Sequence, residues 1–219
     1  VLKDSLIVKK LRKHHRDGYL SEVTISDSAN AVGTADDYKK LRNYYYSLLQ
    51  LMDMIHYNSS VTKKVYESAF DLPNSCIVVI THSDIKDNRK VKDYSNDCLR
   101  IRYLGPQSGA KGYLLLKSAL DKLWNVQQKF FLDVHFEPME PAPYIKTHER
   151  YTYTELKKIF DETDVLVAPS IWYETFGFTV LEALSYGVPV IISGNVGAKD
   201  ILVQGAGVVI ENIDAQKLF

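Results

Sequence analysis

The chain has 219 residues, of which 46% are hydrophobic and 25% are charged, so it can bury a core, and its length allows one or two domains. Its 27 basic and 27 acidic side chains balance, which argues against wholesale binding of nucleic acid. No apolar run approaches the roughly 20 residues of a membrane-spanning helix, and the start shows no signal peptide. Cys76 and Cys98 lack metal-ligand spacing, and we interpret them as reduced thiols of a cytoplasmic protein.

The N-terminal third is predicted to be mostly helical. Residues 1–35 are polar and include a basic cluster at residues 9–16, which is typical of a solvated helix face or of a contact with anionic lipid or substrate. Ser60 is predicted to cap a helix over residues 61–70. Before it, residues 36–54 predict a helix, because apolar side chains recur at spacings of three and four. This stripe consists of Leu41, Tyr45, Leu48, Leu49 and Met52.

From about residue 73 onward, predicted strands alternate with predicted helices. The strands are expected at residues 76–80, 99–104, 130–136, 165–169, 188–192 and 208–210. The helices are expected at residues 113–128 and 153–160, from Thr179, and after a cap at Asp214. This alternation indicates an α/β fold, a Rossmann-like parallel sheet flanked by helices. Residues 1–72 would form a separate helical segment, and residues 73–219 the Rossmann-like domain.

Residues 164–202 hold most of the functional information. In this segment Glu174 and Glu182 have seven residues between them and stand between two apolar runs. The order is strand, polar loop, short helix and strand, the repeating unit of a parallel sheet covered by helices. Since ligands of such sheets bind where strands end and loops begin, the loop with Glu174 is expected at a binding edge.

The predicted helix after Gly177 offers an anion site, because its first amides lack intrahelical partners and its dipole favours negative charge. A phosphate-bearing ligand fits this position. Each glutamate also has a structural alternative. Thr179 and Glu182 have the spacing of a capping box, and Glu174 could be an exposed loop carboxylate.

A second loop with candidate site residues joins the strand predicted at residues 99–104 to the helix predicted at residues 113–128. It reads YLGPQSGAKG over residues 103–112. This glycine-containing loop does not have the spacing of a Walker loop. Taken alone, Lys111 could be a solvated lysine at the start of a helix.

Together these segments resemble a known family. The pattern E-x-F-G-x-x-x-x-E-A-x-x-x-G-x-P-V-I is the hallmark of retaining glycosyltransferases with two facing Rossmann-like domains (the GT-B fold), notably glycosyltransferase family 4. The chain carries it as Glu174, Phe176, Gly177, Glu182, Ala183, Gly187, Pro189, Val190 and Ile191. Asp164-Val165 and Pro169-Ser170 also match the strand that precedes the family's motif.

The resemblance implies roles for individual residues. Glu174 would bind hydroxyls of the donor sugar and Glu182 the ribose, since a carboxylate can accept two hydrogen bonds from a vicinal diol. Lys111 would neutralise the diphosphate leaving group, and Glu174 and Lys111 would be the catalytic residues. The donor would also meet Gly105, Ser108, Gly109, Pro169, Phe176, Gly177, Phe178, Thr179 and Val180.

One departure from the family's pattern lies in the loop with Lys111. Pro106 and Gln107 stand where the family usually has an arginine, so Ser108 or loop amides would have to substitute for that charge. Residues 1–72 would be the helical end of the acceptor domain with the crossover. Residues 73–219 would be a donor-binding domain truncated at its C-terminus, so a weakly active or inactive fragment is expected.

The reaction that the resemblance implies is retaining transfer of a hexose from a UDP-, GDP- or ADP-linked sugar. The acceptor would be a glycan, glycolipid or glycoprotein, and no metal or other cofactor would be required. From the resemblance to this family we also expect a role in polysaccharide or glycoconjugate assembly in the cytoplasm, with peripheral association at the inner membrane face. Two alternatives remain: a non-catalytic nucleotide-sugar-binding scaffold, and a nucleotide-sugar epimerase, which needs an acid/base pair that the sequence does not reveal.

Overall fold

The computed structural model describes residues 34–78, 85–92, 94, 97–213 and 218. The chain divides into a smaller compact unit, residues 1–55 with 70–75, and a larger one, residues 56–69 with 76–219. The basic cluster at residues 9–16 and the cap predicted at Asp214 lie outside the described residues. In the described part of the chain no helix has the length and apolar character that a bilayer crossing demands.

In the smaller unit, helix α3 (Ala35–Leu49) confirms the predicted helix but ends five residues early. It begins with a capping box, in which the Thr34 hydroxyl accepts the Asp37 amide and the Asp37 carboxylate accepts the Thr34 amide. The predicted apolar stripe is wrong in part, because Tyr45 and Met52 are about half exposed. Tyr46 instead stacks on Phe70, with ring centroids 5.6 Å apart.

Strands β1 (Ile55–Tyr57) and β2 (Ser75–Ile77) pair in a two-stranded sheet, and helix α4 (Ser60–Ala69) lies between them in the chain. The predicted cap at Ser60 is wrong by one residue. The hydroxyl of Ser59 accepts the Thr62 amide at 3.1 Å and caps the helix. Ser60 is the first helical residue, and its side chain bonds to Asp200 instead.

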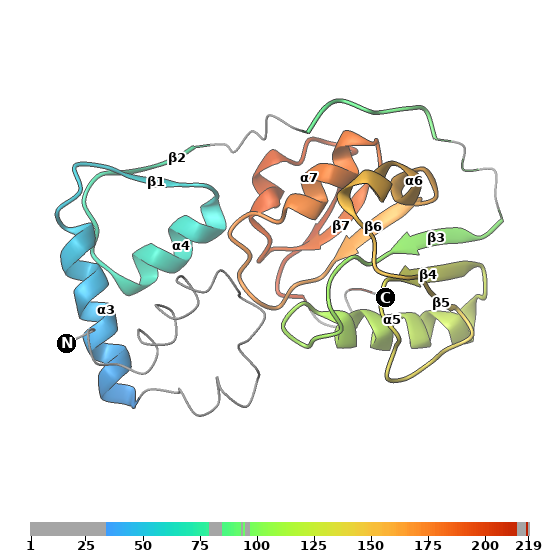
Figure 1. Cartoon of the computed structure of the whole chain (residues 1–219), viewed down its shortest axis with the longest axis horizontal. Coiled ribbons are helices and arrows are strands. Elements are labelled where there is room, and N and C mark those ends of the chain that lie inside the picture. The colour runs from blue at the N-terminus through green and yellow to red at the C-terminus, as the bar shows by residue number, and fades with distance from the viewer. Residues whose placement is uncertain (1–33, 79–84, 93, 95–96, 214–217, 219) are drawn as a thin grey trace. The chain divides into compact units, whose positions relative to one another are not determined.

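The larger unit contains a six-stranded sheet in which every pairing is parallel (Figure 1). The spatial order is β5-β4-β3-β6-β7-β8. Counted along the chain from β3, this is the order 3-2-1-4-5-6 of a Rossmann fold, so the predicted fold class is confirmed. The strands are β3 (Leu99–Arg102), β4 (Phe130–Val134), β5 (Ile145–Thr147), β6 (Val165–Ala168), β7 (Val190–Ser193) and β8 (Gly207–Ile210).

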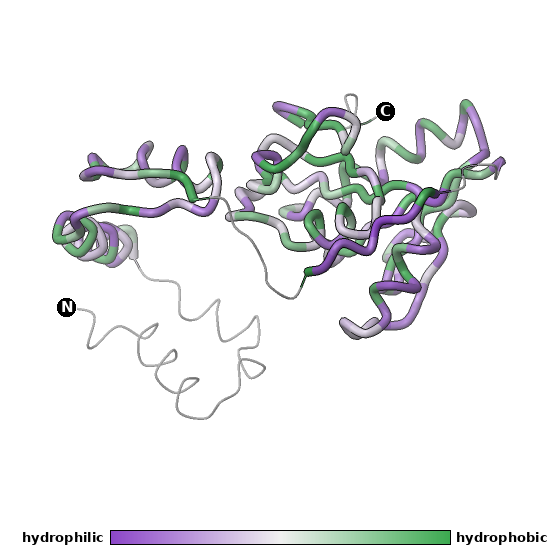
Figure 2. The backbone as a smooth tube through the Cα atoms, turned by 90° about the horizontal axis from the view of Figure 1, so that it is seen from above, coloured by the Kyte–Doolittle hydropathy of each residue, from purple (hydrophilic) through white to green (hydrophobic). Residues whose placement is uncertain are grey.

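Helices cover both faces of this sheet. Helix α5 (Tyr113–Val126) packs on one face, and α6 (Leu156–Asp161) and α7 (Phe178–Ser185) pack on the other (Figure 1). Leu166 and Val167 are neighbours in β6, yet they belong to two separate core clusters, because successive side chains of a strand point to opposite faces. Figure 2 shows hydrophobic and hydrophilic segments alternating along the backbone of the larger unit.

The sequence did not predict β5, which follows the proline-rich loop. Its three residues pair with β4, and Lys146 lies over the ring of Phe131 with its amino group 3.5 Å from the centroid. The shorter elements are 3₁₀ turns, η2 (Tyr153–Glu155) and η3 (Gly197–Ile201). The predicted domain boundary at residue 72 stays a prediction, and α4 belongs to the larger unit.

Candidate functional site

The candidate site lies where the strand order of the sheet reverses, between β3 and β6. The chain leaves β3 toward β4 on one side, and β6 begins the other half of the sheet. Ligands of open α/β sheets bind outside the carboxyl ends of the strands at this reversal. The two loops that leave these ends are residues 103–112 and 169–177, which are the two loops that the sequence singled out.

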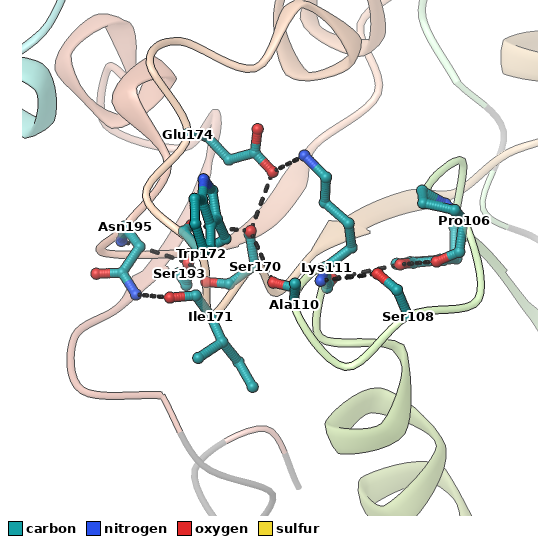
Figure 3. Close-up of polar contacts among 11 residues, drawn as sticks. Pro106, Ser108, Ala110, Lys111, Ser170, Ile171, Trp172, Glu174, Ser193 and Asn195 are labelled. Atoms are coloured by element: carbon teal, nitrogen blue, oxygen red, sulfur yellow. Dashed lines mark hydrogen bonds and ion pairs between the residues drawn. The ribbon is translucent and has the colours of Figure 1, made fainter. Parts of the chain in front are cut away.

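Lys111 and Glu174 meet at this reversal, although 63 positions separate them in the chain. The Lys111 amino group lies 2.5 Å from Oε1 of Glu174, and the Ser170 hydroxyl donates to the same oxygen at 3.0 Å (Figure 3). The side chains of Lys111 and Glu174 are 38% and 22% exposed. The site therefore holds a charged pair that a ligand can reach from solvent.

The loop after β3 is folded back on itself by local hydrogen bonds. The Lys111 amide donates to the Ser108 hydroxyl at 3.2 Å, and the Gly112 amide donates to the Gly109 carbonyl at 2.9 Å. The Tyr103 hydroxyl donates to the Pro106 carbonyl at 2.8 Å. Burial raises the pKa of this phenol, and the nearby charge of Glu174 adds to the shift, so Tyr103 remains a neutral donor.

The loops after β3 and β6 are joined directly. The amides of Ile171 and Trp172 both donate to the Ala110 carbonyl at 2.9 Å. Gly112 permits this approach, because it has φ of 78° and a Cβ there would lie 1.9 Å from the Pro169 carbonyl oxygen. Backbone packing at this point therefore sets the spacing between the loop of Lys111 and the loop of Glu174.

The backbone around Glu174 is held by residues 195–198. The Glu174 amide donates to the Asn195 carbonyl at 2.9 Å, and the Gly197 amide donates to the Glu174 carbonyl at 3.1 Å. The Ala198 amide donates to the Phe176 carbonyl at 2.6 Å. The ring of Phe176 is buried in the core, so only its backbone is available to a ligand.

Helix α7 begins at Phe178, one residue before the predicted start at Thr179. Its N-cap residue is Gly177, with φ of 96°, and no side chain caps it. A Cβ at Gly177 would lie 2.9 Å from Cγ1 of Val196. The positive φ and this close approach both favour glycine at the position. The capping-box alternative for Glu182 is wrong, because Thr179 is not the N-cap residue.

A cavity of about 290 Å³ opens beside the Lys111–Glu174 pair. Seven predicted site residues line it: Gly105, Lys111, Glu174, Gly177, Phe178, Thr179 and Val180. Ser170, Tyr103 and Leu104 line it as well. The sequence predicted Tyr103 and Leu104 at the end of a strand, and this position was the signal that could have identified them as site residues.

The other predicted site residues do not line this cavity: Ser108, Gly109, Pro169, Phe176 and Glu182. Glu182 follows two residues after Val180 in α7, and its charge acts on Tyr151. Burial raises the pKa of Tyr151, the charge of Glu182 raises it further, and Arg102 opposes the shift. The structure thus joins Glu174 to Lys111, and the ribose-binding role of Glu182 stays a prediction.

A larger cavity, of about 560 Å³, lies between residues 85–89 and the C-terminal end of α7. None of the predicted site residues lines it, so we place the candidate site in the smaller cavity. Within the described ranges, no three His, Cys, Asp or Glu side chains gather closely enough to hold a metal ion. The expectation that the donor binds without a metal stays a prediction.

Comparison with known proteins places a known domain over part of the chain. Residues 142–219, which include Glu174 and α7, match the family model described as Glycosyl transferases group 1. An uncharacterized glycosyltransferase of Methanocaldococcus jannaschii is 45% identical over 47 residues, which are 22% of this chain and 12% of that protein.

Solved glycosyltransferases share the fold at low sequence identity. Anabaena HepE in complex with UDP and glucose matches with a TM-score of 0.64 at 14% identity, over 84% of this chain and 57% of that one. Sucrose-phosphate synthase of Thermosynechococcus elongatus matches with a TM-score of 0.65 at 14% identity, over 97% of this chain and 60% of that one. The pneumococcal O-GlcNAc transferase GtfA in complex with UDP and GlcNAc matches with a TM-score of 0.57 at 18% identity, over 80% of this chain and 38% of that one. The chain thus spans less than two thirds of each relative.

Proposed function

We propose that this chain forms the donor-binding site of a retaining glycosyltransferase, which transfers a hexose from a nucleoside diphosphate sugar to a glycan, glycolipid or glycoprotein. The observation that carries the proposal is the Lys111–Glu174 pair, held at 2.5 Å between the loops of β3 and β6 and beside the start of α7. A cation, a helix N-terminus and a hydroxyl-binding carboxylate are the three groups that a diphosphate sugar requires.

Donor binding exchanges the partners of this pair. Lys111 and the first amides of α7 meet the diphosphate, and Glu174 accepts hydrogen bonds from the sugar hydroxyls. Both side chains are partly exposed, so giving up their mutual ion pair costs on the order of 1 kcal/mol. As the diphosphate departs, Lys111 neutralises the charge that develops on it, which stabilises the transition state. No metal is needed for this step in the mechanism that we propose.

The lining of the cavity favours transfer over epimerisation. Among the described lining residues, Glu174 is the one carboxylate and Lys111 the one cationic side chain. A double displacement at a sugar uses two carboxyl groups, and an epimerase uses an acid/base pair beside the sugar. We therefore propose departure and attack on the same face of the sugar, a route to retention that uses no protein nucleophile.

UDP-sugars are our first choice of donor, ahead of GDP- and ADP-sugars. Two structural relatives, HepE and the pneumococcal GtfA, were solved with UDP and a sugar. We further propose that the complete enzyme acts in polysaccharide or glycoconjugate assembly in the cytoplasm, peripherally at the inner membrane face. A non-catalytic nucleotide-sugar-binding scaffold is the second candidate, because Pro106 and Gln107 leave Lys111 as the single lining cation in the described ranges.

Calorimetric titration with UDP, GDP, ADP and their glucose conjugates tests the donor site. We expect saturable binding of one nucleotide and at least about tenfold weaker binding of its sugar conjugate in Lys111→Ala and Glu174→Ala, since each variant loses a charge-assisted contact. Lys157→Ala is the matched control, because Lys157 forms an exposed 2.6 Å pair with Asp161 within helix α6 and lines neither cavity. That control should bind like the unaltered chain.

The outcomes separate the candidate functions. Failure of every nucleotide to bind would overturn the donor site. Binding without transfer to any carbohydrate acceptor would favour the scaffold. Conversion of the sugar nucleotide to its epimer, with no acceptor added, would favour the epimerase.

A further inference from the structure

The N-terminal end of helix α4 touches the loop that carries Glu174, and both belong to the larger unit. The Ser59 hydroxyl donates to the Thr175 carbonyl at 2.6 Å, across 116 positions of the chain. Ser59 is completely buried. Thr175 directly follows Glu174, so this bond holds the backbone next to the carboxylate of the candidate site.

Ser59 makes two backbone bonds that together orient its hydroxyl group, and its oxygen also lies 3.1 Å from the Thr62 hydroxyl. Its oxygen accepts the Thr62 amide at 3.1 Å, and its hydrogen goes to Thr175. The Thr62 hydroxyl lies 3.2 Å from the same carbonyl, but its closer acceptor is Oδ1 of Asn58, at 2.7 Å. A hydroxyl has a single hydrogen, so Ser59 supplies the main side-chain bond to Thr175.

Residues of η3 close this contact from the other side. A Cβ at Gly197 would lie 2.3 Å from the Thr175 carbonyl oxygen and 2.5 Å from the Ser59 hydroxyl, so the Gly197 backbone packs against the Thr175 backbone and the Ser59 side chain without room for a side chain of its own. Asp200, three residues later, accepts the amide and the hydroxyl of Ser60, each at 2.5 Å. The end of α4 is thus fixed both to η3 and to the loop of Glu174.

We propose that Ser59, Ser60 and Asp200 form a brace that positions Glu174 against the donor sugar. Backbone bonds from residues 195–198 hold residues 174–176 along one side, and Ser59 holds Thr175 from α4. Without the Ser59 bond, the loop can shift at Glu174 while the loop of Lys111 stays in place. Since misplacement by about 1 Å can cost a reacting group most of its effect, the brace matters for the sugar more than for the nucleotide. This inference rests on the proposed donor site.

The test compares two ligands, UDP and UDP-glucose, by calorimetry with the full chain. The quantity of interest is the affinity for UDP-glucose divided by the affinity for UDP. In Ser59→Ala we expect this ratio to fall about five- to tenfold, the worth of one hydrogen bond, while UDP binding stays within about twofold. Glu174→Ala should lower the ratio at least as much. Asp200→Asn, which alters an exposed side chain of the brace, should lower it in the same direction and by less.

Ser68→Ala is the matched control. Its hydroxyl bonds to the Val65 carbonyl at 2.7 Å within the same helix, away from the loop of Glu174. The ratio should not change in this variant. If Ser59→Ala and Asp200→Asn remain folded by circular dichroism and keep the ratio of the unaltered chain, or weaken both ligands equally, the brace serves stability alone and the inference is wrong. If the unaltered chain binds neither ligand, the proposed function fails and this inference with it.

Discussion

Ser170 shows how one small side chain connects the elements of the site. Its hydroxyl has one hydrogen and three acceptors within reach: Trp172 O at 2.9 Å, Glu174 Oε1 at 3.0 Å and Ala110 O at 3.2 Å. Its own carbonyl accepts the Ser193 hydroxyl at 2.6 Å. Because these contacts reach both loops and β7, Ser170 links the carboxylate of Glu174 to the sheet (Figure 3).

Two buried tyrosines beside the site differ at their hydroxyl groups. Tyr103 donates to the Pro106 carbonyl, whereas the Tyr113 hydroxyl is buried and has no hydrogen-bond partner in the described part of the chain. We expect Tyr103→Phe to lower the free energy of unfolding by about 1 kcal/mol, because a carbonyl loses its donor. Tyr113→Phe should leave it unchanged or raise it, because an unsatisfied polar group is removed. Urea denaturation measures both, and equal losses would contradict the assignment.

At the scale of elements, two glycines separate backbone strain from steric contact. Gly112, at the start of α5, and Gly205, before β8, both have positive φ, of 78° and 85°. A Cβ at Gly112 would collide with the Pro169 carbonyl, whereas a Cβ at Gly205 would meet no atom within 4 Å.

Gly205→Ala should therefore cost about 1 kcal/mol of unfolding free energy, the strain of a left-handed residue. Gly112→Ala should cost more than about 3 kcal/mol, since the loops after β3 and β6 must move apart. Urea denaturation of both variants measures these losses, and their midpoints can be compared directly if unfolding free energy depends equally steeply on urea concentration in both. Similar losses in the two variants would mean that the close approach of these loops does not contribute to stability.

Most elements could be predicted because their signals are local. Helix α5, predicted over residues 113–128, has Leu116, Ala119 and Leu120 on its buried face at helical spacing. The failures occur where distant contacts override local preference. Helix α3 ends early because the chain turns into β1, whose Ile55 amide donates to Asn74. Adjacent serines could not be told apart as caps, and Asp200 decides between them by taking Ser60.

Over the whole molecule, buried phenols make stability dependent on alkaline pH. Five tyrosines of the described ranges have a raised pKa, and burial is the largest cause for each: Tyr57, Tyr103, Tyr113, Tyr144 and Tyr151. In the unfolded chain these phenols lose protons near pH 10, while the folded chain keeps them. The unfolded state then binds fewer protons, so unfolding free energy falls as pH rises.

The contribution of these phenols should be fully present below about pH 10 and be lost as pH rises above that value. Urea unfolding at about pH 8 and about pH 11, with tyrosinate absorbance as a second signal, measures this dependence. If the five buried tyrosines ionised while the free energy of unfolding stayed the same, the prediction would be contradicted.

The periodicity of the sequence was sufficient to predict the α/β class, most of the strands and the two loops with candidate residues. These signals each span only a few neighbouring positions. The motif around Glu174 was also readable, since its residues lie within one short segment. Long-range packing alone joined Lys111 to Glu174 across 63 positions and Ser59 to Thr175 across 116. Strand order and the meeting of loops depend on which distant backbones pack together, and no local pattern records that choice.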